Sequence, residues 1–219
     1  MIHNSTYKYS LIVMVLLFSL SLAGIAQNKG KTKEEKKLKM DNLKEYAVIE
    51  TTMGTIEVEL YPADAPKTVE NFVKLAEKKY FDGIIFHRIS KGFVIQGGDP
   101  TGTGSGGKSI WGKEFADELN PNTPSFKEGY KKGVVAMANR GPNTNTSQFF
   151  IMLRDNTGLP KNYTIFGKVS KGLDVVDAIG QVEIIPAMGP TDGKPKVDVV
   201  MKKVTIRREG AQQQKEEKK

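Results

Sequence analysis

The chain has 219 residues, a length that suits one folded domain with extensions, and a formal net charge of +8. It contains no cysteine, which excludes disulfide bonds, a cysteine protease, a thiol redox enzyme and a bacterial lipoprotein. The basic excess does not predict a nucleic-acid partner, because residues 28–44 hold seven lysines against three acids, whereas residues 45–208 hold 22 basic and 19 acidic residues.

Residues 1–27 have the pattern of a secretory signal peptide. Lys8 precedes an apolar run at residues 11–22, and small residues follow up to Ala26, the expected cleavage point. The run is shorter than the roughly 20 apolar residues that a membrane span needs. We therefore expect export to the periplasm or cell envelope, with an uncleaved N-terminal membrane tether as the alternative.

Two charged segments flank the expected domain at residues 45–208. Residues 28–44 are rich in lysine and lack aromatic side chains, which predicts a linker. Residues 209–219 contain the run QQQKEEKK and are expected to form a disordered charged tail.

Short strands dominate the expected domain. Residues 46–50 and 55–60 read as a hairpin, because apolar and acidic residues alternate in the second run. Further strands are expected at the following positions: 84–89, 93–96, 133–138, 148–152, 164–169 and 197–207.

Only two helices are expected. One covers residues 69–79 with Thr68 as its cap, and the other covers residues 172–179. Many short strands, Gly/Pro turns and few helices predict a mainly-β fold, a closed antiparallel barrel with helical caps.

Residues 102–109, GTGSGGKS, match the phosphate-loop pattern G-x-x-x-x-G-K-[ST]. That motif works as a turn between a buried parallel strand and a helix. Here Gly112 falls early in the would-be helix, and no alternating strand and helix units follow. We therefore expect a packing loop and no bound nucleotide.

His87 is the only histidine beyond the signal region, and we expect a hydrogen-bonded interior residue rather than a catalyst. One histidine and no cysteine make an ordinary zinc site unexpected. A serine triad would also lack a nucleophile elbow. We expect no metal and no cofactor.

Two stretches carry the functional signal, FHRISKGFVIQ at residues 86–96 and MANRGPNTNTSQFFIM at residues 137–152. Each places a few polar side chains among apolar ones. The polar and aromatic residues that stand out are Arg88, Phe93, Gln96, Asn139, Gln148 and Phe150. A guanidinium among apolar neighbours requires a partner for its donors. Such a set predicts a peptide-binding groove without an obvious nucleophile or general base.

These stretches, together with IFGKV at residues 165–169 and GKPKVDVVMKKVTI near the end, resemble the cyclophilins, a family of peptidyl-prolyl cis-trans isomerases. The resemblance covers residues 45–208. It implies a closed eight-stranded antiparallel barrel capped by two α-helices, with the groove on its outer face. It also makes the GTGSGGKS loop a family feature beside that groove.

The resemblance assigns roles to individual residues. It places the catalytic arginine at Arg88, with Gln96 and Asn139 as further catalytic-site residues. It implies that the following residues bind substrate: Phe93, Val94, Ala138, Gln148, Phe150, Leu159 and Tyr163. Gly158 stands where many members have a tryptophan, which implies weak cyclosporin binding. Tyr163 stands where many members have a histidine, and bacterial-type members resemble this chain in lacking that histidine.

The expected function is therefore cis-trans isomerisation of X-Pro bonds in unfolded or flexible polypeptides, by an exported monomer that assists protein folding. The alternative is a non-catalytic module that binds proline-containing segments as a chaperone or scaffold. An assay of isomerisation on a short Ala-Pro peptide separates the two.

Overall fold

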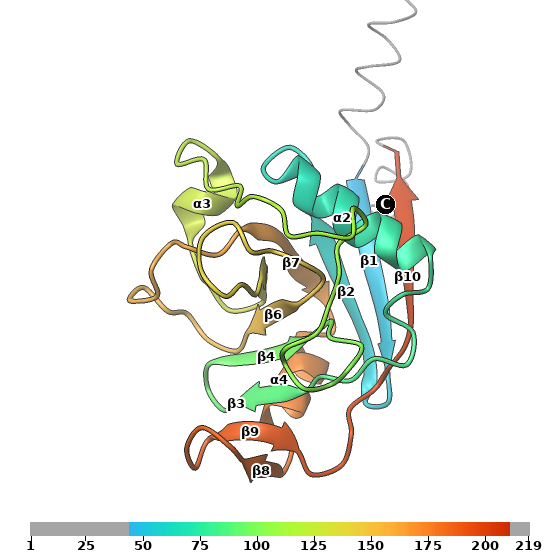
Figure 1. Cartoon of the computed structure of the whole chain (residues 1–219), viewed down its shortest axis with the longest axis vertical. Coiled ribbons are helices and arrows are strands. Elements are labelled where there is room, and N and C mark those ends of the chain that lie inside the picture. The colour runs from blue at the N-terminus through green and yellow to red at the C-terminus, as the bar shows by residue number, and fades with distance from the viewer. Residues whose placement is uncertain (1–43, 211–219) are drawn as a thin grey trace, which may run out of the picture. The chain divides into compact units, whose positions relative to one another are not determined.

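The structure is a computed structural model that describes residues 44–210 (Figure 1). Residues 44–208 form one compact unit. The predicted signal peptide, nearly all of the lysine-rich linker and residues 211–219 of the tail lie outside the described residues.

Ten strands form a single sheet, which runs in the order β10-β1-β2-β7-β5-β6-β4-β3-β9-β8. The pairs from β1 through to β8 are antiparallel. The bounds of the strands are β1 Lys44–Thr51, β2 Gly54–Leu60, β3 Arg88–Ser90, β4 Val94–Gly97, β5 Val134–Met137, β6 Phe149–Met152, β7 Ile165–Lys171, β8 Ile184–Pro186, β9 Asp192–Pro195 and β10 Met201–Glu209.

The mainly-β prediction is confirmed, but the predicted counts of eight strands and two helices are wrong for residues 44–210, which hold ten strands and three helices. The missed elements β8 and β9 have three and four residues, too few for an alternating pattern to be recognised. The strand order has β10 and β8 at its two ends, so the closed barrel stays a prediction. Backbone hydrogen bonds from Phe86 to Val199 (2.9 Å) and from Met201 to Ile84 (2.8 Å) do connect the segment before β3 with the start of β10.

The predicted β1–β2 hairpin is present, with Thr51 opposite Gly54. Gly54 has φ of +137°, a conformation that favours glycine. The alternating apolar residues of β2, namely Ile56, Val58 and Leu60, are all buried in the core. The alternation in the sequence therefore identified the inward face correctly.

Helix α2 spans Pro66–Glu77, and a residue far away in the sequence caps its N-terminus. The predicted cap by Thr68 is wrong, because the N-cap position is Ala65. Instead the Glu118 carboxylate accepts hydrogen bonds from the backbone N–H groups of Lys67 (3.0 Å) and Thr68 (2.8 Å) and from the Thr68 hydroxyl. A carboxylate at this end also complements the helix dipole, so a residue 50 positions away replaces the local cap.

Two further helices are short. The missed α3 spans Pro124–Glu128, only five residues, and α4 spans Leu173–Gln181, close to its predicted position. Val176 and Ile179 of α4 are fully buried. Among the helices described, none has the length and apolar character needed to span a membrane.

The two faces of the strand group β5-β6-β4-β3 contact different apolar clusters. Ile89, Ile95 and Ile151 are paired across adjacent strands and belong to the main core, which α2 and α4 complete. The opposite face carries a smaller cluster made of Val94, Tyr130, Val134, Ala136, Phe150, Met152 and Ile165. Successive strand residues point to opposite faces, so this second cluster lies on the other side of the sheet from the main core.

Candidate active site

The register of the strands brings three predicted site residues into one row on the face of the smaller cluster. Arg88 of β3 lies opposite Gln96 of β4, and Gln96 lies opposite Phe150 of β6. Side chains at directly opposed positions point to the same face, with Cβ atoms about 4.5–5.5 Å apart. Residues separated by up to 62 positions therefore become neighbours, which the sequence alone could not show.

A groove of about 640 Å³ lies over this row. Nine of the ten predicted site residues line it, namely Arg88, Phe93, Val94, Gln96, Ala138, Asn139, Phe150, Leu159 and Tyr163. The tenth, Gln148, is buried beneath and contacts the groove through Gln96. The structure therefore brings the predicted residues together around one cavity.

Phe93 reaches the groove from the β3–β4 turn. Its backbone N–H donates to Ser90 at 2.9 Å, and its carbonyl accepts from Leu153 at 2.8 Å. Gly92 has φ of +69°, which a side chain would oppose. The turn therefore fixes the position of the Phe93 ring at one wall.

The apolar floor of the groove rests on packed aromatic rings. Phe150 is buried and meets Tyr163 edge to face, with ring centroids 5.5 Å apart. The Tyr130 hydroxyl donates to the Tyr163 carbonyl at 3.0 Å and accepts from its N–H at 2.9 Å. Burial raises the pKa of Tyr130 to about 12, so this phenol keeps its proton and holds the Tyr163 backbone in place.

Arg88 is held on two sides at the polar edge of the groove. Its Nε and Nη2 donate to the two carboxylate oxygens of Asp192 at 2.9 and 2.6 Å. Its Nη1 donates to Gln96 Oε1 at 3.0 Å. A guanidinium has five N–H donors, so three are used here and two are left for a ligand.

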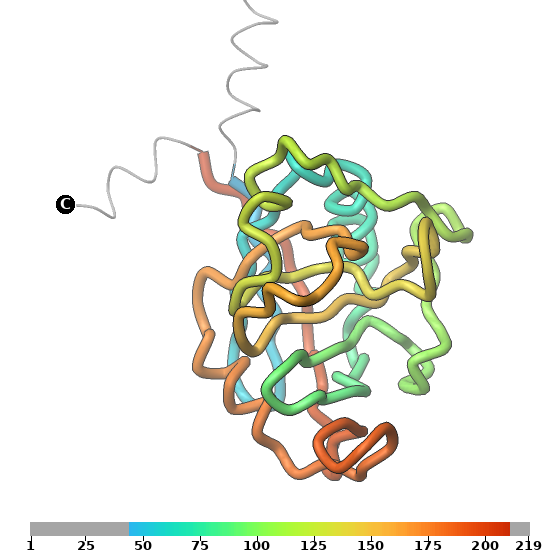
Figure 2. The backbone as a smooth tube through the Cα atoms, turned by 90° about the vertical axis from the view of Figure 1, so that its left-hand side faces the viewer, coloured from blue at the N-terminus to red at the C-terminus, as the bar shows by residue number. Residues whose placement is uncertain are grey.

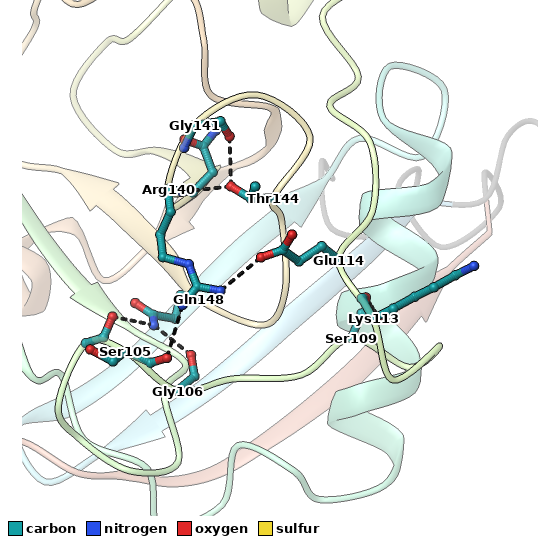
Figure 3. A network of polar contacts seen from close by, with 11 residues as sticks. Ser105, Gly106, Ser109, Lys113, Glu114, Arg140, Gly141, Thr144 and Gln148 are labelled. Carbon is teal, nitrogen blue, oxygen red and sulfur yellow. Dashed lines mark hydrogen bonds and ion pairs between the residues drawn. The ribbon is translucent and has the colours of Figure 1, made fainter.

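The Gln96 amide continues this network into the GTGSGGKS loop. Gln96 Nε2 donates to Gln148 Oε1 at 3.0 Å. Gln148 Nε2 in turn donates to the carbonyls of Gly104 at 2.9 Å and Gly106 at 2.8 Å (Figure 3). These contacts define the orientation of both amides and connect Arg88 to the loop.

The loop itself encloses the buried carboxylate of Asp99. That carboxylate accepts from the N–H groups of Thr101, Thr103, Gly104 and Gly106 and from two threonine hydroxyls. Burial alone would raise the pKa of Asp99, but these hydrogen bonds outweigh it and lower the pKa to about 2.

This arrangement explains the false phosphate-loop match. The backbone N–H groups that would cradle a phosphate already bind a carboxylate of the same chain. The next helix in the described chain, α3, begins only at Pro124, so the turn into a helix that the motif requires does not follow the loop.

Arg140 also lines the groove, and its side chain extends toward the loop at Ser105 (Figure 3). Its guanidinium donates to Glu114 at 2.9 Å and to the Ser105 carbonyl at 3.4 Å, and its backbone N–H donates to the Thr144 hydroxyl. The sequence reading missed Arg140 as a groove residue. An exposed Arg–Glu pair of this kind contributes little to stability.

Asn139 supports the opposite wall with its side chain. Its Nδ2 donates to the Asn162 carbonyl at 2.9 Å, and its Oδ1 accepts from the Gly141 N–H at 3.3 Å. The side-chain amide therefore holds the chain at residue 162, next to Tyr163.

His87 is buried as predicted, but the prediction that it is hydrogen-bonded is wrong. Neither ring nitrogen has a hydrogen-bond partner. The ring lies under the loop, where a Cβ at Gly104 would be only 3.6 Å from Nε2. Burial lowers the pKa of His87, and the nearby Arg88 charge lowers it further, against an opposing effect of Asp99.

The β8–β9 hairpin contributes the largest group of groove residues that the sequence-based prediction missed. Ala187, Met188, Asp192, Gly193 and Lys194 all line the groove. The turn-forming letters TDG gave a weak local signal, but nothing in the sequence indicated that this turn lies against β3. That contact depends on the pairing of Ser90 with Asp192.

The site therefore combines an apolar pocket with fixed hydrogen-bond donors. Within residues 44–210, no three histidine, aspartate or glutamate side chains form a group that could hold a metal ion. These features suit a class of protein that binds a peptide segment through an apolar residue and hydrogen bonds.

Comparison with known proteins identifies the family. The family model described as "Cyclophilin type peptidyl-prolyl cis-trans isomerase/CLD" matches residues 46–206. A peptidyl-prolyl cis-trans isomerase-like 1 protein of Neurospora crassa is 48% identical over 163 residues, which cover 74% of this chain and 93% of that protein. The human protein of the same name is 50% identical over 144 residues, 66% of this chain and 84% of that one.

A solved structure of the same family also resembles this chain. A crystal structure of a Cryptosporidium parvum cyclophilin-type peptidyl-prolyl cis-trans isomerase aligns with a TM-score of 0.67 at 36% identity, over 75% of this chain and 98% of that one. The chain belongs to the cyclophilin-type peptidyl-prolyl cis-trans isomerases, a family of enzymes that act on proline-containing peptides.

Proposed function

We propose that this chain isomerises X-Pro bonds at the groove described above, with Arg88 as the catalytic residue. The observation that carries the proposal is the position of Arg88. A guanidinium held by Asp192 and Gln96 stands at the edge of an apolar pocket and keeps two donors for a ligand.

The chemistry requires no bond to a nucleophile and no proton transfer. Conjugation of the proline nitrogen with the carbonyl gives the X-Pro bond its barrier, of about 18–20 kcal/mol for peptide bonds in general. Twisting the bond removes this conjugation and makes the nitrogen a hydrogen-bond acceptor. A donor fixed at that position stabilises the twisted state more than either planar state, which lowers the barrier.

The remaining groove residues hold the substrate. Phe93, Val94, Phe150 and Leu159 enclose the proline ring, and Tyr163 packs edge to face on Phe150. The substrate backbone binds along Ala138 and Asn139. Because the Asn139 side chain is already engaged with Asn162 and Gly141, its main chain forms this contact.

Gln148 fixes the orientation of the Gln96 amide, and Gln96 in turn accepts a hydrogen bond from Arg88. Gln96 presents its carbonyl oxygen to the guanidinium because Gln148 accepts from its amide nitrogen. A rotated Gln96 amide would place N–H against N–H, so the network allows only one orientation. This supports Gln96 as a residue that orients Arg88 rather than one that reacts.

A related structure supports the substrate class. The Cryptosporidium parvum protein was also crystallised in the presence of the dipeptide Ala-Pro, and this structure aligns with a TM-score of 0.66 at 36% identity. For the present chain we propose Pro-containing segments of unfolded or flexible polypeptides as substrates, with no cofactor.

We further propose that the enzyme is exported and assists the folding of exported proteins. The support is the signal-like pattern of residues 1–27. The relatives compared above come from Neurospora crassa, human and Cryptosporidium parvum, so only the signal-like pattern and the residue at Tyr163 support the bacterial-type assignment. A fusion of residues 1–30 to a reporter tests the export, and a reporter that stays in the cytoplasm contradicts it.

The proposed chemistry is tested by Arg88→Ala in an isomerisation assay on a short Ala-Pro peptide, with binding followed by NMR. We expect a loss of roughly 10²–10³-fold in kcat, the range found when a donor to a transition state is removed. The peptide should still bind, because the apolar pocket is intact.

Near-normal isomerisation by the folded Arg88→Ala variant would overturn the role of Arg88. A wild-type protein that binds the peptide without accelerating exchange would instead be the non-catalytic proline-binding module.

A further inference from the structure

The β8–β9 hairpin delivers a single carboxylate to Arg88. The hairpin lies beside β3 at the lower end of the molecule (Figure 2). Asp192 begins β9, and both of its carboxylate oxygens accept from the guanidinium, at 2.9 and 2.6 Å. The Asp192 side chain is only 13% exposed and that of Arg88 27%.

The backbone around Asp192 is firmly placed. Asp192 pairs with Ser90 of β3, and its N–H donates to the Gly189 carbonyl at 3.2 Å while its own carbonyl accepts from Ala187 at 2.9 Å. A Cβ at Gly193 would lie 2.0 Å from the Ile185 carbonyl oxygen, so the two strands approach too closely for any other residue there. The carboxylate therefore has little freedom to move away from Arg88.

The two partners of Arg88 restrict its guanidinium in complementary ways. Asp192 binds the Nε and Nη2 edge through two parallel hydrogen bonds, and Gln96 binds Nη1. A planar group held at both edges cannot rotate about its Nε–Cζ or Cδ–Nε bonds. The two remaining donors, one on Nη1 and one on Nη2, are then held in fixed directions.

Asp192 also has the protonation state that this role requires. The hydrogen bond from Arg88 is the main cause that lowers the pKa of Asp192 below its ordinary value of 3.8. The group is thus a carboxylate at neutral pH and accepts at both oxygens.

From this geometry we propose that Asp192 is a positioning residue for the isomerase reaction. It does not contact the substrate; it fixes the direction of the Arg88 donors toward the prolyl nitrogen. This inference rests on the proposed function of Arg88. A merely structural ion pair would stabilise the fold but would leave the rate of the bound complex unchanged.

The test compares kcat and KM of the wild type, Asp192→Ala and Asp192→Asn on the Ala-Pro peptide. Displacement of a catalytic group by about 1 Å can cost 10²-fold in rate, so we expect kcat of Asp192→Ala to fall about tenfold or more, with KM within about twofold. Asp192→Asn keeps one acceptor oxygen and should recover part of the rate. Glu183→Gln is the matched control, because Glu183 pairs with Lys196 at 3.1 Å on an exposed surface beside the same hairpin, and neither residue lines the groove.

Two further measurements separate positioning from folding. In the Arg88→Ala background, Asp192→Ala should lower kcat no further, because its effect acts through Arg88. In NMR spectra of the folded variants, the Arg88 side chain should show hindered rotation in the wild type and averaged rotation in Asp192→Ala.

The outcomes are distinct. If Arg88→Ala loses its activity but folded Asp192→Ala retains the wild-type kcat, or loses kcat equally in the Arg88→Ala background, this inference is wrong and the proposed function stands. If Arg88→Ala itself keeps its activity, the proposed function is wrong. Averaged rotation of Arg88 in the wild type would also contradict the inference.

Discussion

The two faces of the strand group β5-β6-β4-β3 are built from alternate residues of the same short segments, but one face packs in the core and the other lines the groove. Toward the main core, Ile89, Ile95 and Ile151 fill space and are completely buried. On the opposite face the next residues along, Arg88, Gln96 and Phe150, form the groove. One face sets the stability of the fold and the other sets its chemistry, so changes on the two faces should have separable effects.

The largest expected effect on stability comes from the core face. Ile151→Ala removes a fully buried side chain and leaves a cavity, which should lower the free energy of unfolding by roughly 2–5 kcal/mol. The groove residues are not touched, so kcat per folded molecule should stay close to the wild type. Chemical denaturation and the peptide assay below the new midpoint measure both quantities.

Ile151→Val is the matched control, with an expected loss of about 0.5–1.5 kcal/mol. A folded Ile151→Ala protein whose kcat falls as far as that of Arg88→Ala would show that the two faces are not separable.

The same comparison shows what the sequence could reveal. The alternation of apolar and acidic residues identified β2 and the side of it that faces the core, because side-chain direction along a strand is a local property. The resemblance to the cyclophilins added Ala138, Leu159 and Tyr163, which come from loops without a periodic pattern.

What the sequence did not reveal depends on contacts between distant segments. Asp192 meets Arg88 across 104 positions, and Glu118 caps α2 across 50. Asp192 begins a strand of only four residues and Glu118 lies outside any helix or strand, so the local sequence pattern indicates a partner for neither carboxylate. The Asp99 carboxylate likewise fills a loop that otherwise resembles a phosphate site.

On the groove face, Phe93→Ala should weaken substrate binding more than it weakens the fold. Phe93 is only partly buried and packs on the smaller cluster. Loss of its contact with the proline ring should cost roughly 1–3 kcal/mol of binding free energy, visible as a higher KM. Titration of the peptide by NMR measures the binding directly.

Phe93→Leu keeps part of the apolar wall, so its affinity for the peptide should lie between that of the wild type and that of Phe93→Ala. Unchanged peptide affinity in Phe93→Ala would exclude Phe93 from the proline pocket.

The smallest expected effect concerns His87, which lies beneath the loop beside the groove. Because burial lowers its pKa, the unfolded chain takes up a proton near pH 6.5 before the folded chain does. Stability is therefore full above about pH 6.5 and falls as the pH drops below it, by at most about 1.4 kcal/mol at pH 5.5.

Denaturation of the wild type and His87→Gln at pH 7.5 and pH 5.5 tests this. The difference between the two pH values should shrink in the variant, which has no group to titrate at this site. An equal difference in both proteins would show that His87 titrates normally.

The proposed catalysis depends most on the fixed fork of donors at Arg88, and Arg88→Lys tests it directly. The variant keeps the positive charge, but an ammonium on a flexible chain cannot bind Asp192 and Gln96 at two edges and still aim at the prolyl nitrogen. NMR exchange spectroscopy on an Ala-Pro peptide should therefore show binding to the variant with isomerisation reduced nearly to the level of Arg88→Ala. A rate in Arg88→Lys close to that of the wild type would contradict the account, because charge alone would then suffice.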